Sequence, residues 1–150
     1  MVIYFGADHR GFALKGHLLE LVRNMGYEVA DCGNTALEPG DSYVIFASEV
    51  AKRVAADPAG SRGVVVCGAG AGVDMVANKF DGVRSVLGIN PDQVHAARHD
   101  DDANVLSLAA DMTEREDAEK MIKIFLATPF GNEPRRSERL AEIKEIEKNN

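Results

Sequence analysis

The sequence of 150 residues predicts an α/β fold: a three-layer, doubly wound, Rossmann-like structure around a five-stranded parallel sheet. Two observations support this prediction. Short apolar runs that suit buried strands recur at residues 2–6, 27–31, 63–67, 83–87 and 104–108. Segments with helical apolar spacing follow them, at residues 11–24, 43–56, 71–79, 91–99 and 113–127. Because parallel strands need right-handed crossovers, we expect helices on both faces of the sheet and a flavodoxin-like strand order of 2-1-3-4-5.

The first strand and helix show the pattern most clearly. The strand VIYFG is followed by a helix whose apolar residues gather on one broad side: Phe12, Leu14, Leu18, Leu19, Leu21 and Val22. Most of its charged residues lie on the opposite side, and Gly26 closes the helix as a C-terminal glycine does. The later strands, YEVAD, GVVVC, VRSVL and NVLSL, each precede a helical segment in the same way. This alternation is typical of a parallel sheet that is covered on both faces.

The pattern changes after Pro129. The segment RRSERLAEIKEIEKNN predicts a charged helix in which Leu140, Ile143 and Ile146 recur every third residue. A stripe this narrow is typical either of an arm that lies on another subunit or of a terminal helix that packs on its own domain. We therefore expect one domain over residues 1–150, with a core over about 1–128 and a C-terminal dimerisation arm over about 129–150.

Composition limits the function. The net charge of −7 argues against broad binding to nucleic acid or to a membrane surface. No apolar run approaches the roughly 20 residues that span a bilayer, and the first strand is too short for the core of a signal peptide. With only two cysteines, Cys32 and Cys67, we expect a cytoplasmic protein with free thiols.

In open α/β sheets the ligand site lies beyond the carboxyl ends of the strands. The first strand is followed there by Asp8 and His9, and the third by Cys67 and a loop with three glycines, GAGAG at 68–72. Glycines let backbone N–H groups approach a ligand oxygen, and the helix start that follows adds positive charge. The alternative is a tight turn without a ligand; a dinucleotide site is a weaker interpretation, because the spacing G-x-G-x-G does not match that motif.

Several side chains allow two interpretations. Cys67 is either a reactive thiol at a helix start or a small buried apolar residue, whereas Cys32 lacks a comparable neighbourhood and suits a structural role. His9 suits phosphate binding or proton transfer, or else a surface pair with Asp8 at the start of the first helix. Further along the chain, His95 and His99 are four residues apart, which suits a metal site, but the absence of a third ligand favours a solvated helix end. Arg135 and Arg139, also four apart, suit either a phosphate or ion pairs with neighbouring glutamates.

Four segments together resemble the ribose-5-phosphate isomerase B and galactose-6-phosphate isomerase family. They are FGADHRGFALK at 5–15, VVVCGAGAGVDMVANKFDGVRS at 64–85, NVL at 104–106 and RRSER at 135–139. The resemblance runs the length of the chain. The combination of DHxGF with CGxGxG-x5-NK is specific, more so than either motif alone, and it favours a chemical role for Cys67.

The resemblance implies an aldose–ketose isomerisation of a phosphorylated sugar, through a cis-enediolate and without a metal or other cofactor. Cys67 would be the general base, and the backbone amides of the loop would hold the enediolate oxygen: Gly68, Ala69, Gly70, Ala71 and Gly72. The remaining substrate-binding candidates are Asp8, His9, Asn78, Asp101, Arg135 and Arg139, with the two arginines on the phosphate and Asn78 supporting the loop. The family builds this site at a dimer interface, so we expect a homodimer or a dimer of dimers with shared sites.

Three departures from the family pattern concern the substrate. Ala69 stands where the family usually has a threonine that assists proton transfer, and Asp74 is a candidate replacement. The ring-opening histidine of the family falls on Asp100 in this register, with His99 one position earlier, so that His99 serves after a shift of the helix end, Asp100 acts, or the ring opens differently. The Asp-Tyr-Pro segment of the family is DSYV, at 41–44. Ribose 5-phosphate remains the expected substrate. The alternatives are a tetrose or hexose phosphate such as galactose 6-phosphate, a catalytically silent sugar-phosphate binder and, least favoured, a flavin- or nucleotide-binding module.

Overall fold

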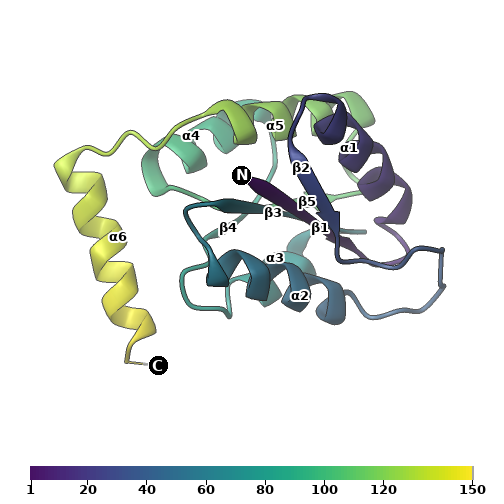
Figure 1. Ribbon diagram of the computed structural model, residues 1–150, viewed down its shortest axis with the longest axis horizontal. Coiled ribbons are helices and arrows are strands. Elements are labelled where there is room, and N and C mark those ends of the chain that lie inside the picture. The colour runs from purple at the N-terminus through teal and green to yellow at the C-terminus, as the bar shows by residue number, and fades with distance from the viewer. Residues whose placement is uncertain (150) are drawn as a thin grey trace.

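A computed structural model describes residues 1–149, and it shows strands and helices in alternation (Figure 1). The strands are β1 (Val2–Ala7), β2 (Glu28–Asp31), β3 (Ser61–Cys67), β4 (Ser85–Leu87) and β5 (Val105–Ala109). The helices are α1 (Phe12–Asn24), α2 (Tyr43–Ala56), α3 (Ala71–Ala77), α4 (Pro91–Asp101), α5 (Arg115–Ala127) and α6 (Pro134–Glu147). The predicted α/β class is confirmed. None of the helices within residues 1–149 is both long and apolar enough to cross a membrane.

The sheet is parallel throughout, as predicted, but its strand order is β2-β1-β3-β5-β4. The predicted order 2-1-3-4-5 is therefore wrong for the last two strands. Every residue of β5 is buried, whereas β4 has only three residues and all of them are half-buried. The short, partly exposed strand occupies the edge of the sheet, and the longer apolar strand lies between β3 and β4, where it pairs on both sides.

Helices cover both faces of the sheet. Helices α1, α4 and α5 lie on one side and α2 and α3 on the other (Figure 1). Along β3 the side chains alternate between two apolar cores: Val64 and Val66 join Phe5 and Phe125 under α1 and α5, while Val65 and Cys67 face α2 and α3. This alternation determines the face of the sheet to which the Cys67 sulfur belongs.

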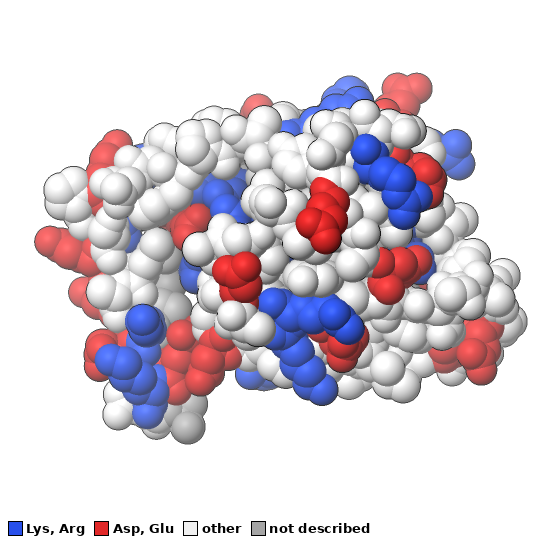
Figure 2. Space-filling view, viewed as in Figure 1, with Lys and Arg blue, Asp and Glu red and all other residues white. Residues whose placement is uncertain are grey.

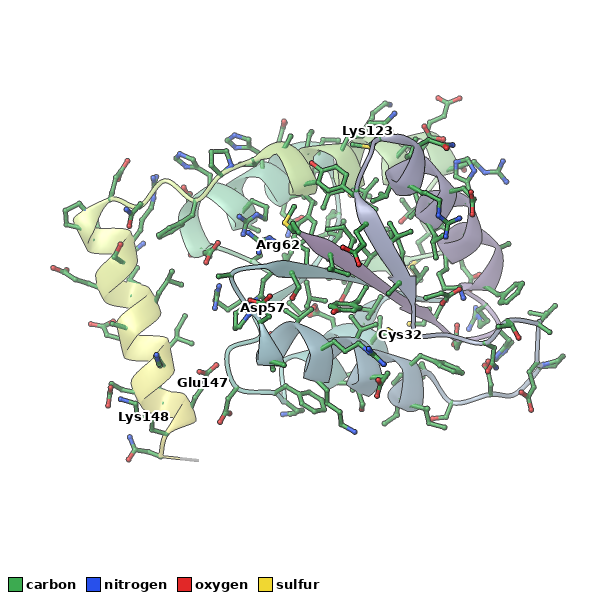
Figure 3. The ribbon with its side chains drawn as sticks, viewed as in Figure 1. Cys32, Asp57, Arg62, Lys123, Glu147 and Lys148 are labelled. Atoms are coloured by element: carbon green, nitrogen blue, oxygen red, sulfur yellow. The ribbon has the colours of Figure 1, made fainter. Side chains whose placement is uncertain are left out.

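Helix α6 lies beside this body as a separate arm, and none of its residues is buried. Its last turn is joined to the body by Glu147, whose Oε1 accepts a hydrogen bond of 2.8 Å from the Gly82 N–H (Figure 3). In Figure 2 the free end of α6 projects from the body, and acidic and basic side chains lie next to each other on it. Leu140, Ile143 and Ile146 form the narrow apolar stripe that the sequence predicted, and Ile146 remains 62% exposed.

Candidate active site

The first part of the site follows β1. Asp8 is buried, and its Oδ1 accepts hydrogen bonds of 3.0 Å from the N–H groups of Arg10 and Gly11, in the turn that leads into α1. Gly11 is required in this turn because a Cβ there would lie 2.5 Å from the Val66 carbonyl oxygen. His9 points toward the loop after β2, where its Nδ1 lies 2.9 Å from Asp41 Oδ1. Asp8 and His9 therefore lie at the carboxyl edge of the sheet, one strand away from Cys67.

Cys67 ends β3 and is 5% exposed. Its sulfur accepts a hydrogen bond from the Gly70 N–H at 3.2 Å, so this amide of the loop faces the thiol. Gly70 has φ 73° and ψ −30°, a conformation that residues with a side chain rarely adopt. A Cβ there would also lie 2.5 Å from Leu87 Cδ1 and 3.0 Å from the Ala109 nitrogen. The glycine spacing thus serves the close approach of this loop to the two neighbouring strands.

Ala69, the residue at the family's threonine position, is exposed at the tip of the loop. It lines a cavity of about 180 Å³ together with Leu87, Ile89, Met112 and Thr113. The lining is mostly apolar, and Thr113 is the one lining residue whose side chain carries a hydroxyl group. A threonine from the turn after β5 therefore lines the same cavity as the alanine.

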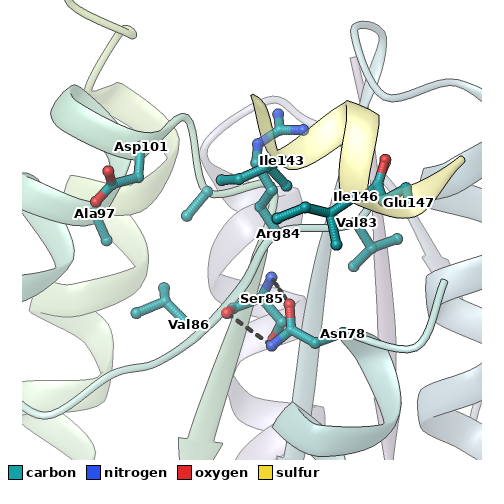
Figure 4. Close-up of a pocket in the computed structure, with 11 residues that line it drawn as sticks. Asn78, Val83, Arg84, Ser85, Val86, Ala97, Asp101, Ile143, Ile146 and Glu147 are labelled. Atoms are coloured by element: carbon teal, nitrogen blue, oxygen red, sulfur yellow. Dashed lines mark hydrogen bonds between the residues drawn. The ribbon is translucent and has the colours of Figure 1, made fainter. Parts of the chain in front are cut away.

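Asp74 and Asn78 extend from α3 toward β4. Asp74 Oδ1 accepts a hydrogen bond of 2.6 Å from Ser85 Oγ, which is itself 2.8 Å from Ser107 Oγ. Asn78 bonds both backbone groups of Ser85, through its Nδ2 at 3.0 Å and its Oδ1 at 2.8 Å (Figure 4). Both side chains fasten α3 to the edge strand. The Asp74 carboxylate is thus engaged with Ser85, its role in place of the threonine stays a prediction, and Asn78 supports the helix that follows the loop.

The end of α4 carries both candidates for ring opening, His99 and Asp100. Helix α4 runs to Asp101, and Asp102 then adopts a left-handed conformation with φ 48°. Arg98 and Arg84 hold the Asp102 carboxylate at 2.8 and 2.7 Å. The chain therefore leaves the helix at Asp102, and both His99 and Asp100 stay within the last turn of α4.

His99 and Asp100 face the segment that leads into the arm. His99 Nδ1 lies 2.9 Å from Asp100 Oδ1, and Arg136 Nη2 lies 2.8 Å from the same oxygen. The hydrogen bond from His99 lowers the pKa of Asp100, burial opposes this effect, and the positive charge of Arg136 adds to it. Since an ionised carboxylate only accepts, the His99 hydrogen lies on Nδ1 and its Nε2 remains for another partner. Arg136 was missed by the sequence analysis, which considered only the arginines at the family's spacing.

His95 and His99 stack with ring centroids 5.6 Å apart, and they do not converge on a common point as metal ligands do. Within residues 1–149, no group of three or more histidine, cysteine or acidic side chains is placed to hold a metal ion.

The candidate residues form two groups, one at the carboxyl ends of the strands and one at their amino ends. Asp8, His9 and Cys67 lie at the carboxyl ends of the strands. Helix α4 runs back for 11 residues, about 16 Å, so that His99 lies near the amino ends. Both ends can be followed in Figure 3. Cys32, which follows β2, marks the carboxyl ends, and Arg62 near the start of β3 marks the amino ends, on the side where Glu147 of the arm lies.

The arm lies at the amino ends of the strands. Arg135 and Arg139 are exposed there, and within residues 1–149 neither has an ion-pair partner. Asp101 lines a cavity of about 440 Å³ between the body and the arm, together with Arg84, Ile143 and Ile146 (Figure 4). Within one chain, the paired arginines therefore do not meet Cys67.

Known proteins of one family resemble this chain along nearly its whole length. The model of the ribose/galactose isomerase family matches residues 3–143. The ribose-5-phosphate isomerase B of Mycobacterium tuberculosis is 32% identical over 148 residues, which cover 99% of this chain and 91% of the relative. The Escherichia coli ribose-5-phosphate isomerase B is 33% identical over 145 residues, with coverage of 95% and 96%.

A solved structure matches over the same extent. The ribose-5-phosphate isomerase B of Mycoplasma genitalium, with bound ribulose 5-phosphate, superimposes with a TM-score of 0.96 at 32% identity and covers 99% of this chain and 97% of that one. A match that spans nearly the whole chain in both sequence and structure shows common ancestry. The chain belongs to the ribose/galactose isomerase family.

Proposed function

We propose that this protein is a cofactor-independent aldose–ketose isomerase that interconverts ribose 5-phosphate and ribulose 5-phosphate. The observation that carries the proposal is the placement of Cys67 at a loop whose Gly70 amide donates to its sulfur. The relatives named above support the choice of substrate, since the Mycoplasma genitalium structure contains ribulose 5-phosphate.

In the proposed reaction, Cys67 removes the proton from C2 of the open-chain aldose and returns it to C1. The intermediate is a cis-enediolate, whose negative oxygen needs hydrogen-bond donors that are already in place. The amides of residues 68–72 supply such donors at the start of α3. Because Gly70 and Gly72 are closely packed against Leu87 and the Tyr43 ring, the loop is held rigidly before the substrate arrives.

We further propose that the site is completed by a second copy of the chain. Arg135 and Arg139 lie at the edge of the sheet opposite Cys67, so one chain cannot bring both to the same phosphosugar. A partner arm that reaches the carboxyl edge would add the two arginines as a phosphate clamp beside His9. The same partner would add His99, whose Nε2 is available to move the proton that opens the sugar ring.

The missing hydroxyl at Ala69 also has a proposed replacement. Thr113 lines the same cavity as Ala69 and carries the same functional group as the family's threonine. We propose that the Thr113 hydroxyl assists the proton transfer in place of that threonine. The same cavity favours a second candidate function, an isomerase for a tetrose or hexose phosphate. Its lining is mostly apolar where the family has a threonine, and such a lining would suit a different sugar.

The test is a turnover assay over aldose phosphates with four, five and six carbons. The native protein is compared with Cys67→Ala and with the matched control Cys32→Ala, which removes the other thiol from outside the loop. We expect turnover of ribose 5-phosphate that is lost in Cys67→Ala and retained in Cys32→Ala. Turnover confined to another chain length would select the second candidate. No turnover, with a thermal shift on binding, would identify a silent binder and refute the proposal.

A further inference from the structure

We propose that Asp41 is a positioning residue of this site: it holds the His9 imidazole in a single orientation and tautomer, with Nε2 toward the substrate. The inference rests on the proposed function only for the identity of that substrate. Asp41 lies in the loop between β2 and α2, in the segment DSYV, and no role follows for it from the sequence alone.

One oxygen of Asp41 makes two contacts with the same residue. Asp41 Oδ1 accepts a hydrogen bond of 2.8 Å from the His9 backbone N–H and lies 2.9 Å from His9 Nδ1. Bonding to both the backbone and the ring restricts rotation of the side chain about its first torsion. Because the Asp41 side chain is only 7% exposed, solvent competes little for these bonds.

The carboxylate also selects the tautomer of the ring. Burial acts to raise the pKa of Asp41, but the hydrogen bonds from His9 outweigh it and the pKa lies below its usual range. The group is therefore ionised at neutral pH and can only accept hydrogen bonds. The ring hydrogen must then lie on Nδ1, which leaves Nε2 as an acceptor when the ring is neutral and as a donor when it is charged.

Asp41 is itself held by a chain of contacts that ends in the body of the protein. Its Oδ2 accepts a hydrogen bond of 3.0 Å from Asn34 Nδ2. The backbone carbonyl of Asn34 in turn accepts a hydrogen bond of 3.2 Å from Lys15 Nζ. Lys15 is 2% exposed, and its ammonium group also lies 2.6 and 2.8 Å from the two oxygens of Asp31. A buried ammonium group needs such partners, so this lysine fixes the loop to both α1 and β2.

The consequence is an imidazole whose exposed edge points in one direction before the substrate binds. The His9 side chain is 32% exposed. Without Asp41 the ring would rotate and exchange between tautomers, so only a fraction of molecules would present Nε2 correctly. A misplaced group in an active site costs on the order of 100-fold in rate, and we expect a loss of this order in kcat/KM for Asp41→Ala.

The experiment combines NMR of the imidazole nitrogens with kinetics. The protein has four histidines, so His9→Gln identifies the His9 signals by their disappearance. The variants are Asp41→Ala, Asp41→Asn and the control Glu38→Ala, which removes an exposed carboxylate of the same loop that lies 3.4 Å from Asn34 Nδ2. Circular dichroism verifies that each variant folds.

We expect the Nδ1–H tautomer in the native protein and in Glu38→Ala, and its loss in Asp41→Ala. Asp41→Asn retains an oxygen that can accept both hydrogen bonds, so it should preserve much of the tautomer preference and part of kcat/KM. An unchanged tautomer in Asp41→Ala would overturn the proposal, as would an equal kinetic loss in Glu38→Ala. The NMR result does not require turnover, so it decides the role of Asp41 even if no phosphosugar is isomerised.

Discussion

Substitution of Gly70 by alanine tests the geometry of the loop that follows Cys67. At φ 73° and ψ −30°, an alanine at this position would be strained, and sparsely populated backbone conformations cost about 1–3 kcal/mol each. The new Cβ would also lie 3.0 Å from the Ala109 nitrogen and 3.0 Å from the Leu108 carbonyl carbon, which belong to a central strand and cannot easily move. Overpacking of this kind costs roughly 1–3 kcal/mol. We therefore expect Gly70→Ala to lower the free energy of unfolding by about 2–6 kcal/mol.

Gly16 in α1 provides the matched control. A Cβ at Gly16 would meet no atom within 4 Å, and its backbone is helical. Gly16→Ala should therefore raise the free energy of unfolding by about 0.5–1 kcal/mol, because alanine loses less conformational entropy in a helix than glycine does. The opposite signs of the two glycine-to-alanine changes depend on the local geometry alone.

The assay is urea denaturation of the three proteins, followed by circular dichroism, together with turnover of ribose 5-phosphate. Gly70→Ala should also reduce turnover strongly, since the Gly70 N–H donates to the Cys67 sulfur. The reasoning would be refuted if Gly70→Ala were as stable as the native protein, or if both variants were destabilised alike.

Three further predictions concern the arm, acid stability and the reacting end of the substrate. Arg136→Leu removes the ion pair with Asp100, so limited proteolysis between α5 and α6 should become faster while the melting temperature of the core stays nearly unchanged. Equal cleavage rates for the variant and the native protein would contradict this. The pKa of Asp41 is lowered in the folded state, so the carboxylate stabilises the fold above its ordinary pKa, and this contribution is lost as the pH falls through the folded-state value. In acid titrations, Asp41→Asn should therefore lose less stability below about pH 4 than the native protein does. Thr113→Val should lower kcat by about 10- to 100-fold if the Thr113 hydroxyl assists proton transfer, and adding Ala69→Thr to that variant should restore kcat. A Thr113→Val enzyme with the native kcat would exclude this role for Thr113.

The elements of the fold could be predicted from local patterns. Residues 43–56 were predicted as a helix and form α2 with those same bounds, because their apolar spacing has a helical period throughout. The strand order could not be predicted in the same way. Whether β4 or β5 lies at the edge depends on lateral pairing, and the only local signals are the three-residue length of β4 and the uninterrupted apolar run of β5.

For the site, the sequence identified the loop but not its supports. Gly70 and Cys67 are close in the chain, and their arrangement follows from the strand, turn and helix pattern. Asp41 meets His9 across 32 positions, and no periodic pattern indicates such a contact. Asp74 shows the converse case: helical spacing places it one turn after Gly70, but its hydrogen bond to Ser85 on β4 could not be predicted from that spacing.

The central claim is that Cys67 of one chain and the arm arginines of another form one isomerase site. The most direct measurement is therefore complementation between Cys67→Ala and the double variant Arg135→Ala, Arg139→Ala. Each should be nearly inactive alone on ribose 5-phosphate. After the two are unfolded and refolded together, we predict that activity returns, because mixed dimers contain one intact site. A mixture that forms mixed dimers and stays inactive would contradict the claim.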